Sequence, residues 1–156
     1  MIALVLALVT SFPSSSKTSW MSPQSFRLVI GMTRSDALRR LSDSGWTIKP
    51  GRDKNEKIVD CSEDKAMTLQ FEDDRLRSIR FELFAMLPEV RAAFHEKKAD
   101  LVKEHGEPKK TVRSKSVVVY DDRLPNIIVV LNDDANSEYG KKGIGYLAVR
   151  YYDPAR

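Results

Sequence analysis

The chain has 156 residues, with 26 Lys and Arg against 22 Asp and Glu, which gives a formal net charge of +4. Charged residues make up 31% of the chain and hydrophobic residues 42%, which excludes a disordered protein and a bundle of membrane-spanning helices. The length fits a single domain, or at most two small ones that share a core. The one cysteine, Cys61, excludes an intramolecular disulfide and is expected as a half-buried thiol on a strand.

The N-terminus has the pattern of a secretory signal. Residues 2–9 form an unbroken apolar run, followed by a stretch rich in Ser and Pro, and no charged residue precedes Lys17. Eight residues are too few to cross a bilayer core, which needs roughly 20, but they suit the hydrophobic part of a signal peptide. The alternative is an apolar N-terminus or a first strand. The sequence thus predicts a signal peptide over residues 1–16, a linker over 17–25, and an exported protein in the periplasm or extracellular space.

The first regular element is a short helix that begins after Thr33. Thr33 is a residue type that caps free backbone N–H groups, and Asp36 stands three residues on, as in a capping box. Ala37 and Leu41 supply an apolar stripe, and Gly45 is a typical helix end. A helix of about 11 residues is expected here.

The apolar period then changes from 3.6 to 2. Met67, Leu69 and Phe71 alternate with polar residues, and the same alternation returns in residues 79–83 after the turn formers at 73–74. This pattern predicts a hairpin with its odd-numbered side chains on one apolar face. A strand over residues 57–61 precedes it.

The second half repeats the order of helix and strands. Pro88 suits a first helical turn, an apolar stripe interrupted by lysines follows, and Gly106 ends the helix. Three strand-like runs follow, at residues 117–120, 127–131 and 144–152. The prediction is a single α+β domain over residues 26–156, with helices packed on one face of an antiparallel sheet. It would consist of two helix-plus-hairpin repeats, at about 26–84 and 85–156.

Residues 26–46 resemble the start of small exported bacterial domains of the SmpA/OmlA and beta-lactamase-inhibitor-protein type. The resemblance rests on Gly-Met-Thr leading into Asp-Ala-Leu and closing on Gly-Trp, and on the apolar positions of the hairpin at residues 69–79. It implies a curved antiparallel sheet backed by helices, and a role in binding other proteins. The chain departs from the family in having neither the lipid-anchor cysteine of the SmpA/OmlA proteins nor the disulfide pairs of the inhibitor proteins.

The strands of the second half have apolar residues at both odd and even positions, that is, on both faces of the sheet. A sheet with only one face covered by helices does not require this. Part of the face opposite the helices should therefore be covered by the loop over residues 132–143, by a second copy of the chain or by a partner protein. Tyr and Arg beside Val and Ile are also typical of interface hot spots. The residues predicted to bind, all of one strand parity, are Arg80, Phe84, Tyr120, Tyr146, Arg150 and Tyr152.

The sequence contains few patterns typical of a catalytic or metal-binding site. His95 and His105 are ten residues apart on one predicted helix, about 15 Å along its axis, and cannot bind one metal ion together. The Asp pairs stand between strands, where Asp is an ordinary turn former. We expect no enzyme activity, no cofactor and no metal site.

A basic run at residues 109–115 is expected as a solvated loop, with contact to an anionic surface as the alternative. Its cations are Lys109, Lys110, Arg113 and Lys115. Export makes nucleic acid an unsuitable partner. The sequence predicts a noncatalytic exported domain that binds a protein through the open face of its sheet. The alternatives are a homodimeric structural envelope protein with that face self-buried, and less favourably a small enzyme.

Overall fold

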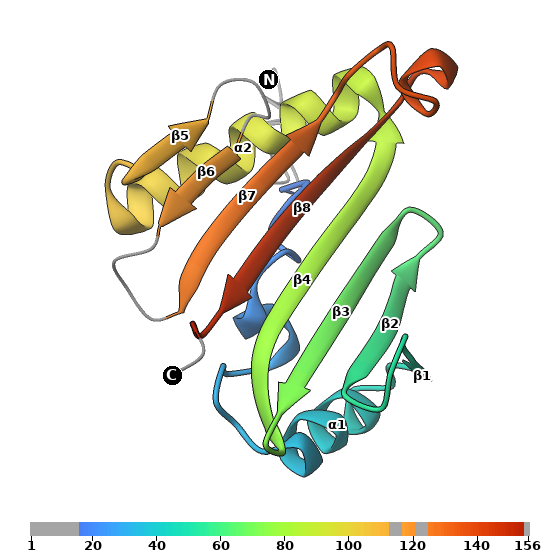
Figure 1. Cartoon of the computed structure of the whole chain (residues 1–156), viewed down its shortest axis with the longest axis vertical. Coiled ribbons are helices and arrows are strands. Elements are labelled where there is room, and N and C mark those ends of the chain that lie inside the picture. Colours follow the sequence, from blue (N-terminus) through green and yellow to red (C-terminus); the bar gives the residue numbers. More distant parts are fainter. Residues whose placement is uncertain (1–15, 113–116, 121–124, 155–156) are drawn as a thin grey trace, which may run out of the picture.

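The protein is an α+β domain built on one antiparallel sheet, as the sequence predicts (Figure 1). The computed structural model describes residues 16–112, 117–120 and 125–154. The helices are η1 (Pro23–Phe26), α1 (Arg34–Asp43), α2 (Leu87–His105) and η3 (Gly140–Lys142). The strands are β1 (Ile48–Pro50), β2 (Glu56–Ser62), β3 (Lys65–Glu72), β4 (Arg75–Met86), β5 (Lys110–Val112), β6 (Val117–Tyr120), β7 (Asn126–Asn132) and β8 (Ile144–Tyr152).

The eight strands form one continuous sheet in the order β1-β2-β3-β4-β8-β7-β6-β5. The two halves of the chain meet where β4 pairs with β8, in the middle of the sheet. The prediction of two helix-plus-hairpin repeats is not confirmed, because each of the long helices is followed by four strands rather than by one hairpin. The short edge strands β1 and β5 were not predicted.

One face of the sheet is covered by α1, α2 and the N-terminal segment that lies between them (Figure 1). The linker predicted over residues 17–25 is wrong, since Thr18 and Met21 are fully buried. The Trp20 ring meets the Phe81 ring edge-on, with 5.8 Å between centroids, and Phe26 packs on the same ring. The Ser and Pro residues of this segment are typical of a linker, so the sequence did not predict that its apolar side chains are buried in the core.

Local signals set the ends of α1. The Thr33 hydroxyl accepts a hydrogen bond from the Asp36 N–H at 3.3 Å, which satisfies one of the free donors of the first turn. Gly45 follows the helix with φ +86°, a left-handed conformation that side chains disfavour. Ala37 and Leu41 are buried against the sheet, as predicted.

Helix α2 packs on β8, β4 and β7. Pro88 lies in its first turn, where the missing N–H costs nothing, and Gly106 ends it with φ +83°. Its buried stripe is Val90, Ala93, Phe94, Lys97 and Leu101. A lysine therefore occupies the middle of the apolar stripe of this helix.

The hairpin of β3 and β4 turns at Asp73 and Asp74, which have φ of 49° and 60°. Two successive left-handed residues match the right-handed twist of the two strands they connect. Phe81, fully buried, points toward the helices, while Phe84 on the same strand is 43% exposed on the opposite face. The predicted alternation along β4 is thus confirmed.

Replacing each phenylalanine of β4 by alanine tests this assignment of faces. Phe81→Ala should lower the free energy of unfolding by about 3–5 kcal/mol, because it leaves a cavity in the core. Phe84→Ala, the matched control, should cost about 1 kcal/mol or less, since it removes mainly a ring contact at the surface. Urea denaturation of both variants measures the difference, and equal losses would contradict the assignment.

Candidate functional site

The open face of the sheet, which we define as the face opposite the helices, gathers most of the predicted binding residues on its two central strands. Directly opposed residues of neighbouring strands project on the same side of a sheet. The register pairs Arg80 with Arg150 and Phe84 with Tyr146 across β4 and β8. Tyr152, two residues beyond Arg150, lies on the same face. Five of the six predicted residues therefore form one continuous surface.

Tyr120 is the exception, and the prediction for it is wrong. The register pairs Tyr120 with Ile127, and Ile127 with Tyr151, so Tyr120 points toward the helices. Its side chain is fully buried, and its hydroxyl donates to the Gly106 carbonyl at 3.2 Å. Parity counted along β4 does not carry over to β6, because the register with β7 sets which side chains of β6 face the core.

One end of the open face carries an aromatic cluster, in which Phe84 and Tyr139 are exposed and Tyr146 is half-buried. The Phe84 and Tyr146 rings lie 4.9 Å apart, and the Tyr139 side chain, from the loop over residues 133–143, is 60% exposed. All three line one small hollow together with Asn132 and Ile144. Sequence reasoning missed Tyr139, although a lone aromatic residue in a polar loop is a recognisable signal.

A hydrogen-bonded network fixes Tyr146 in this cluster. Its hydroxyl donates to Glu82 Oε1 at 3.0 Å, and Arg80 Nε donates to the same oxygen at 2.6 Å. Burial and the Glu82 carboxylate raise the pKa of Tyr146 well above its ordinary value. The phenol therefore stays a donor at physiological pH, and the network holds the ring in one orientation.

Two arginines stand directly opposite each other beside this network. Like charges in that position are unfavourable. The charge of Arg80 is offset by Glu82, whereas Arg150 is exposed and its guanidinium lies 4.9 Å from the centre of the Tyr152 ring. Among the described residues no carboxylate lies within ion-pair distance of Arg150. The N–H donors of this exposed guanidinium are accessible to solvent.

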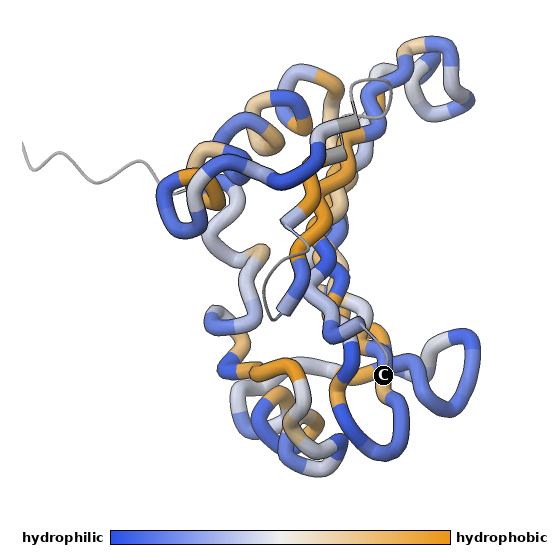
Figure 2. Tube along the Cα trace, turned by 60° about the vertical axis from the view of Figure 1, so that its left-hand side comes forward, coloured by the Kyte–Doolittle hydropathy of each residue, from blue (hydrophilic) through white to orange (hydrophobic). Residues whose placement is uncertain are grey.

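The open face is hollowed between two projecting loops. In Figure 2 the helices lie on one side of the sheet, and two loops stand out on the other. A hollow of about 520 Å³ lies over β3, β4 and β8, and Arg52 and Tyr139 reach it from the loops 51–55 and 133–143. Its floor includes Thr68, Arg80 and Phe84. The shape suits a convex projection of another molecule.

The open face of the second half is more apolar. Ile128 and Val130 of β7 are half-buried there, and Ala148 of β8 is buried between them and β4. No helix of the described chain covers these residues (Figure 1). The loop predicted as a possible cover reaches only the aromatic end, through Tyr139.

No family model, no curated protein and no solved structure matches this chain. The resemblance to SmpA/OmlA and beta-lactamase-inhibitor-protein domains therefore stays a prediction. The structure confirms the predicted class of fold, an antiparallel sheet backed by helices.

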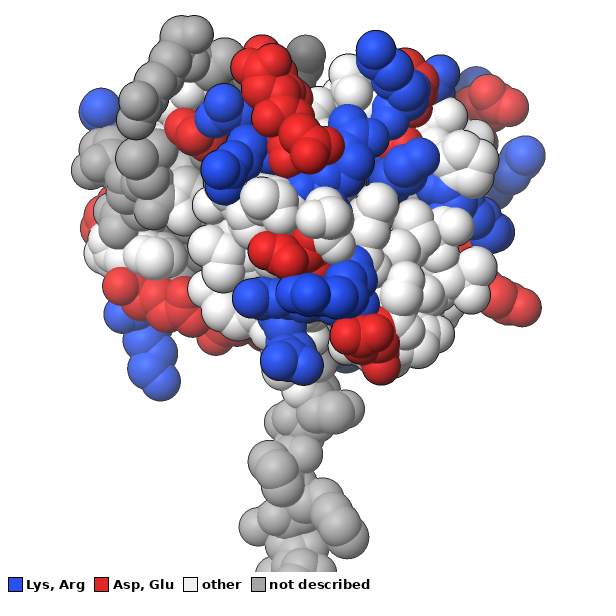
Figure 3. Space-filling model, turned by 90° about the horizontal axis from the view of Figure 1, so that it is seen from below, with Lys and Arg blue, Asp and Glu red and all other residues white. Residues whose placement is uncertain are grey.

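The predicted basic loop is only partly a loop. Lys110–Val112 forms the edge strand β5, and a lysine on an edge strand discourages pairing with another sheet. Lys109 and Lys110 are exposed, whereas Arg113 and Lys115 lie outside the described residues. At the lower end of the molecule, Figure 3 shows basic and acidic side chains interspersed rather than a field of one sign.

The described residues contain no group of three His, Cys, Asp or Glu side chains placed to hold a metal ion. Within this part of the chain, no helix combines the length and apolar character needed to cross a membrane. His105 lies 3.5 Å from Glu104 at the end of α2, and His95 is exposed on the same helix.

Cys61 is half-buried on β2, as predicted. Burial, assisted by the neighbouring Asp60 carboxylate, raises the pKa of the thiol to about 11. At neutral pH the group is thus almost wholly protonated, and a thiol reacts only through its thiolate.

Cys61 should therefore react with a thiol reagent about one to two orders of magnitude more slowly at pH 7.5 than an exposed cysteine. The rate should keep rising with pH up to about 11. A Cys61→Ser/Ser44→Cys double variant, with its single thiol at an exposed position of the α1 end, is the matched control. Equal rates for the two proteins at pH 7.5 would contradict the burial of Cys61.

Proposed function

We propose that the protein is an exported, noncatalytic domain that binds another protein through the open face of its sheet. Its partner presents a carboxylate to the arginines and, farther along the same contact, an apolar or aromatic side chain to the aromatic cluster. The observation that carries the proposal is that one open face holds both an exposed Arg150, which has no ion-pair partner among the described residues, and, four residues back along β8, Tyr146 of the aromatic cluster.

The composition of this surface supports a protein as the partner. Tyr and Arg are enriched among the residues that dominate binding energy in protein interfaces, where they are surrounded by near-neutral contacts that exclude water. Tyr146 is held rigid by Glu82, so little conformational freedom is lost when a partner packs on it. The half-buried Ile128 and Val130 extend the apolar area toward the second half.

Charge supports a carboxylate on the partner. A carboxylate placed over Arg80 and Arg150 would accept hydrogen bonds from Arg150 and relieve the repulsion between the two guanidinium groups. Paired, desolvated charges of this kind also set the register of an interface.

The same arginines weigh against self-association through this face. They lie on the two central strands, so a two-fold dimer packed over the middle of the sheet would bring the arginines of both copies together. Repulsion between them would oppose the homodimer that the sequence left open as an alternative.

Export is supported by the apolar run at residues 2–9. Thr18 and Met21 are fully buried, and Lys17 and Ser16 hydrogen-bond to Glu96 of α2. Removal of the predicted signal peptide, residues 1–16, would leave these contacts in place except that of Ser16.

The native protein, recovered from its own cells, should be found outside the cytoplasm, without the apolar run at residues 2–9 and with a new N-terminus no later than Lys17. Cell fractionation and N-terminal sequencing check this expectation. An intact Met1 on a protein confined to the cytoplasm would contradict export.

Affinity capture from the native envelope or medium, with the tagged chain as bait, tests the binding proposal. The variants are Arg150→Glu and Phe84→Ala on the open face. Lys103→Glu, an equal charge reversal on the exposed side of α2, is the control. We expect a protein that the wild type and Lys103→Glu retain and that both open-face variants lose.

With that partner purified, Arg150→Glu should raise the dissociation constant at least tenfold, and reversing one acidic residue of the partner to Lys should restore part of the affinity. Binding that neither open-face variant weakens would contradict the proposal. A stable dimer in light scattering that Phe84→Ala dissociates would favour self-association instead.

A further inference from the structure

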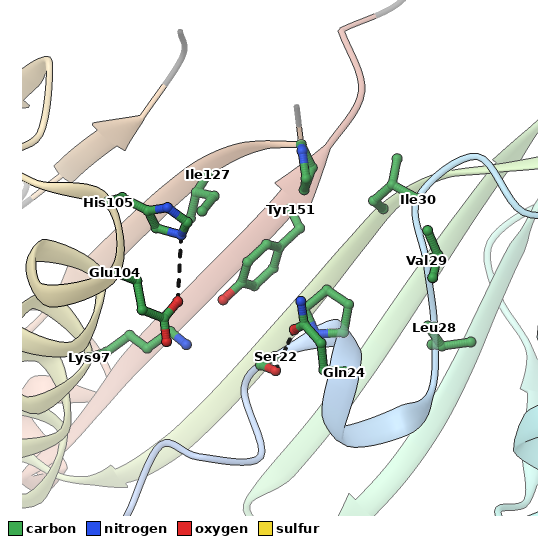
Figure 4. A pocket seen from close by; sticks show the side chains of 12 residues that line it. Ser22, Gln24, Leu28, Val29, Ile30, Lys97, Glu104, His105, Ile127 and Tyr151 are labelled. Carbon is green, nitrogen blue, oxygen red and sulfur yellow. Dashed lines mark hydrogen bonds and ion pairs between the residues drawn. The ribbon is translucent and has the colours of Figure 1, made fainter. Parts of the chain in front are cut away.

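A cavity of about 440 Å³ lies on the helix side of the sheet, between α2 and the N-terminal segment (Figure 4). Its volume falls within the range of pockets that bind small molecules, roughly 300–1,000 Å³. The open face and this cavity are on opposite sides of β8, so they are separate sites. The residues that line it include Leu28, Ile30, Lys97, Glu104, Ile127 and Tyr151.

The lining is divided into a charged end and an apolar end. Figure 4 shows Lys97, Glu104 and His105 on one side, all from α2, and Leu28, Val29 and Ile30 on the other, from the segment before α1. The sheet contributes Ile127 and Tyr151 between the two ends. A ligand that fits both ends has one charged group and one apolar part.

Lys97 is the least exposed charged residue of the lining, since only 6% of its surface is exposed. Its Nζ donates a hydrogen bond to the Met21 carbonyl at 2.9 Å and lies 5.7 Å from the centre of the Tyr151 ring. Among the described residues no carboxylate is within ion-pair distance of this nitrogen. A buried ammonium with three donors and no counter-ion is costly, and an anion would stabilise it.

No neighbouring carboxylate of the described residues serves as the counter-ion of Lys97, so a ligand could take this role. Glu104 lies beside His105 at 3.5 Å, and its side chain is 67% exposed, so it belongs to the mouth of the cavity. Burial lowers the pKa of the Lys97 ammonium, and the more distant Glu104 and Asp100 only partly oppose this effect.

We propose that this cavity binds a small organic monocarboxylate with an apolar tail. The carboxylate accepts a hydrogen bond from Lys97 Nζ, and the tail lies along Leu28, Ile30 and Ile127. A wholly apolar ligand would leave Lys97 unpaired. A multiply charged anion would meet Lys97 as the one buried cation of the described residues, and Glu104 would repel it more strongly than a monocarboxylate.

The first test compares an acid with its uncharged counterpart on the wild-type chain. With 3-phenylpropionate, amide resonances of residues around the cavity, such as Leu28, Ile127 and Tyr151, should shift in a saturable way in NMR spectra. The matching amide, 3-phenylpropanamide, should bind at least tenfold more weakly because it offers no charge to Lys97.

Phenylalanine, as a third probe, distinguishes two sources of the same chemistry. If it binds more tightly than 3-phenylpropionate, Glu104 contacts its ammonium and the ligand is an apolar amino acid. If it binds more weakly, the ligand is a plain carboxylic acid. Both results keep the carboxylate at Lys97.

The second test removes the cation. Lys97→Met keeps the apolar stem and should weaken binding of 3-phenylpropionate at least tenfold, while Lys103→Met, on the exposed side of the same helix, should leave it unchanged. Tyr151 also donates to the Met21 carbonyl, at 3.1 Å, so the variant retains one hydrogen bond there. Its Tm should equal or exceed that of the wild type, because an unpaired buried charge is gone.

The proposal is overturned if no saturable shifts appear around the cavity with 3-phenylpropionate, if the acid and the amide bind equally, or if Lys97→Met binds like the wild type. Arg150→Glu separates this site from the open face, since it should leave carboxylate binding unchanged. The comparison of acid and amide stands even if a variant fails to fold.

Discussion

The rest of the structure depends on the antiparallel pairing of β4 with β8. Nine residue pairs, from Ser78 with Tyr152 to Met86 with Ile144, join the two halves of the chain into one sheet. This register sends Phe81 and Val149 into the core and leaves Arg80 opposite Arg150 on the other face. A shift of one residue would exchange the two sets of side chains and abolish both the core and the binding surface.

The two faces of this sheet then serve different purposes. On the helix face, α1, α2 and the N-terminal segment bury the apolar side chains, but the fit leaves a cavity beside Lys97. On the open face, no described helix covers the strands, and the Glu82 network and the aromatic cluster shape a rigid, hollowed surface. The buried charge of Lys97 and the repulsion between Arg80 and Arg150, which lie opposite each other, both reduce the stability of the fold. This cost favours a functional reason for their presence.

The sequence predicted the elements whose signals are local. The capping residue Thr33 and the glycines Gly45 and Gly106 predicted where the helices begin and end. The alternation of apolar and polar residues predicted the hairpin of β3 and β4. The features that the sequence did not predict, or predicted wrongly, depend on tertiary packing. Three-residue edge strands such as β5 have too few residues for a period, and the buried Met21 stands in a segment that reads as a linker. Tyr120 depends on a register that no local pattern encodes, whereas Lys97 could have been found as a cation inside an apolar stripe.

The pairing of β4 with β8 is tested most directly by the accessibility of single cysteines placed along β8 in a Cys61→Ser background. We expect rapid labelling of thiols at Tyr146, Arg150 and Tyr152, and slow labelling at Leu147, Val149 and Tyr151. Labelling without this alternation, or with the opposite one, would contradict the pairing of β4 with β8 and, with it, the open face as a binding surface.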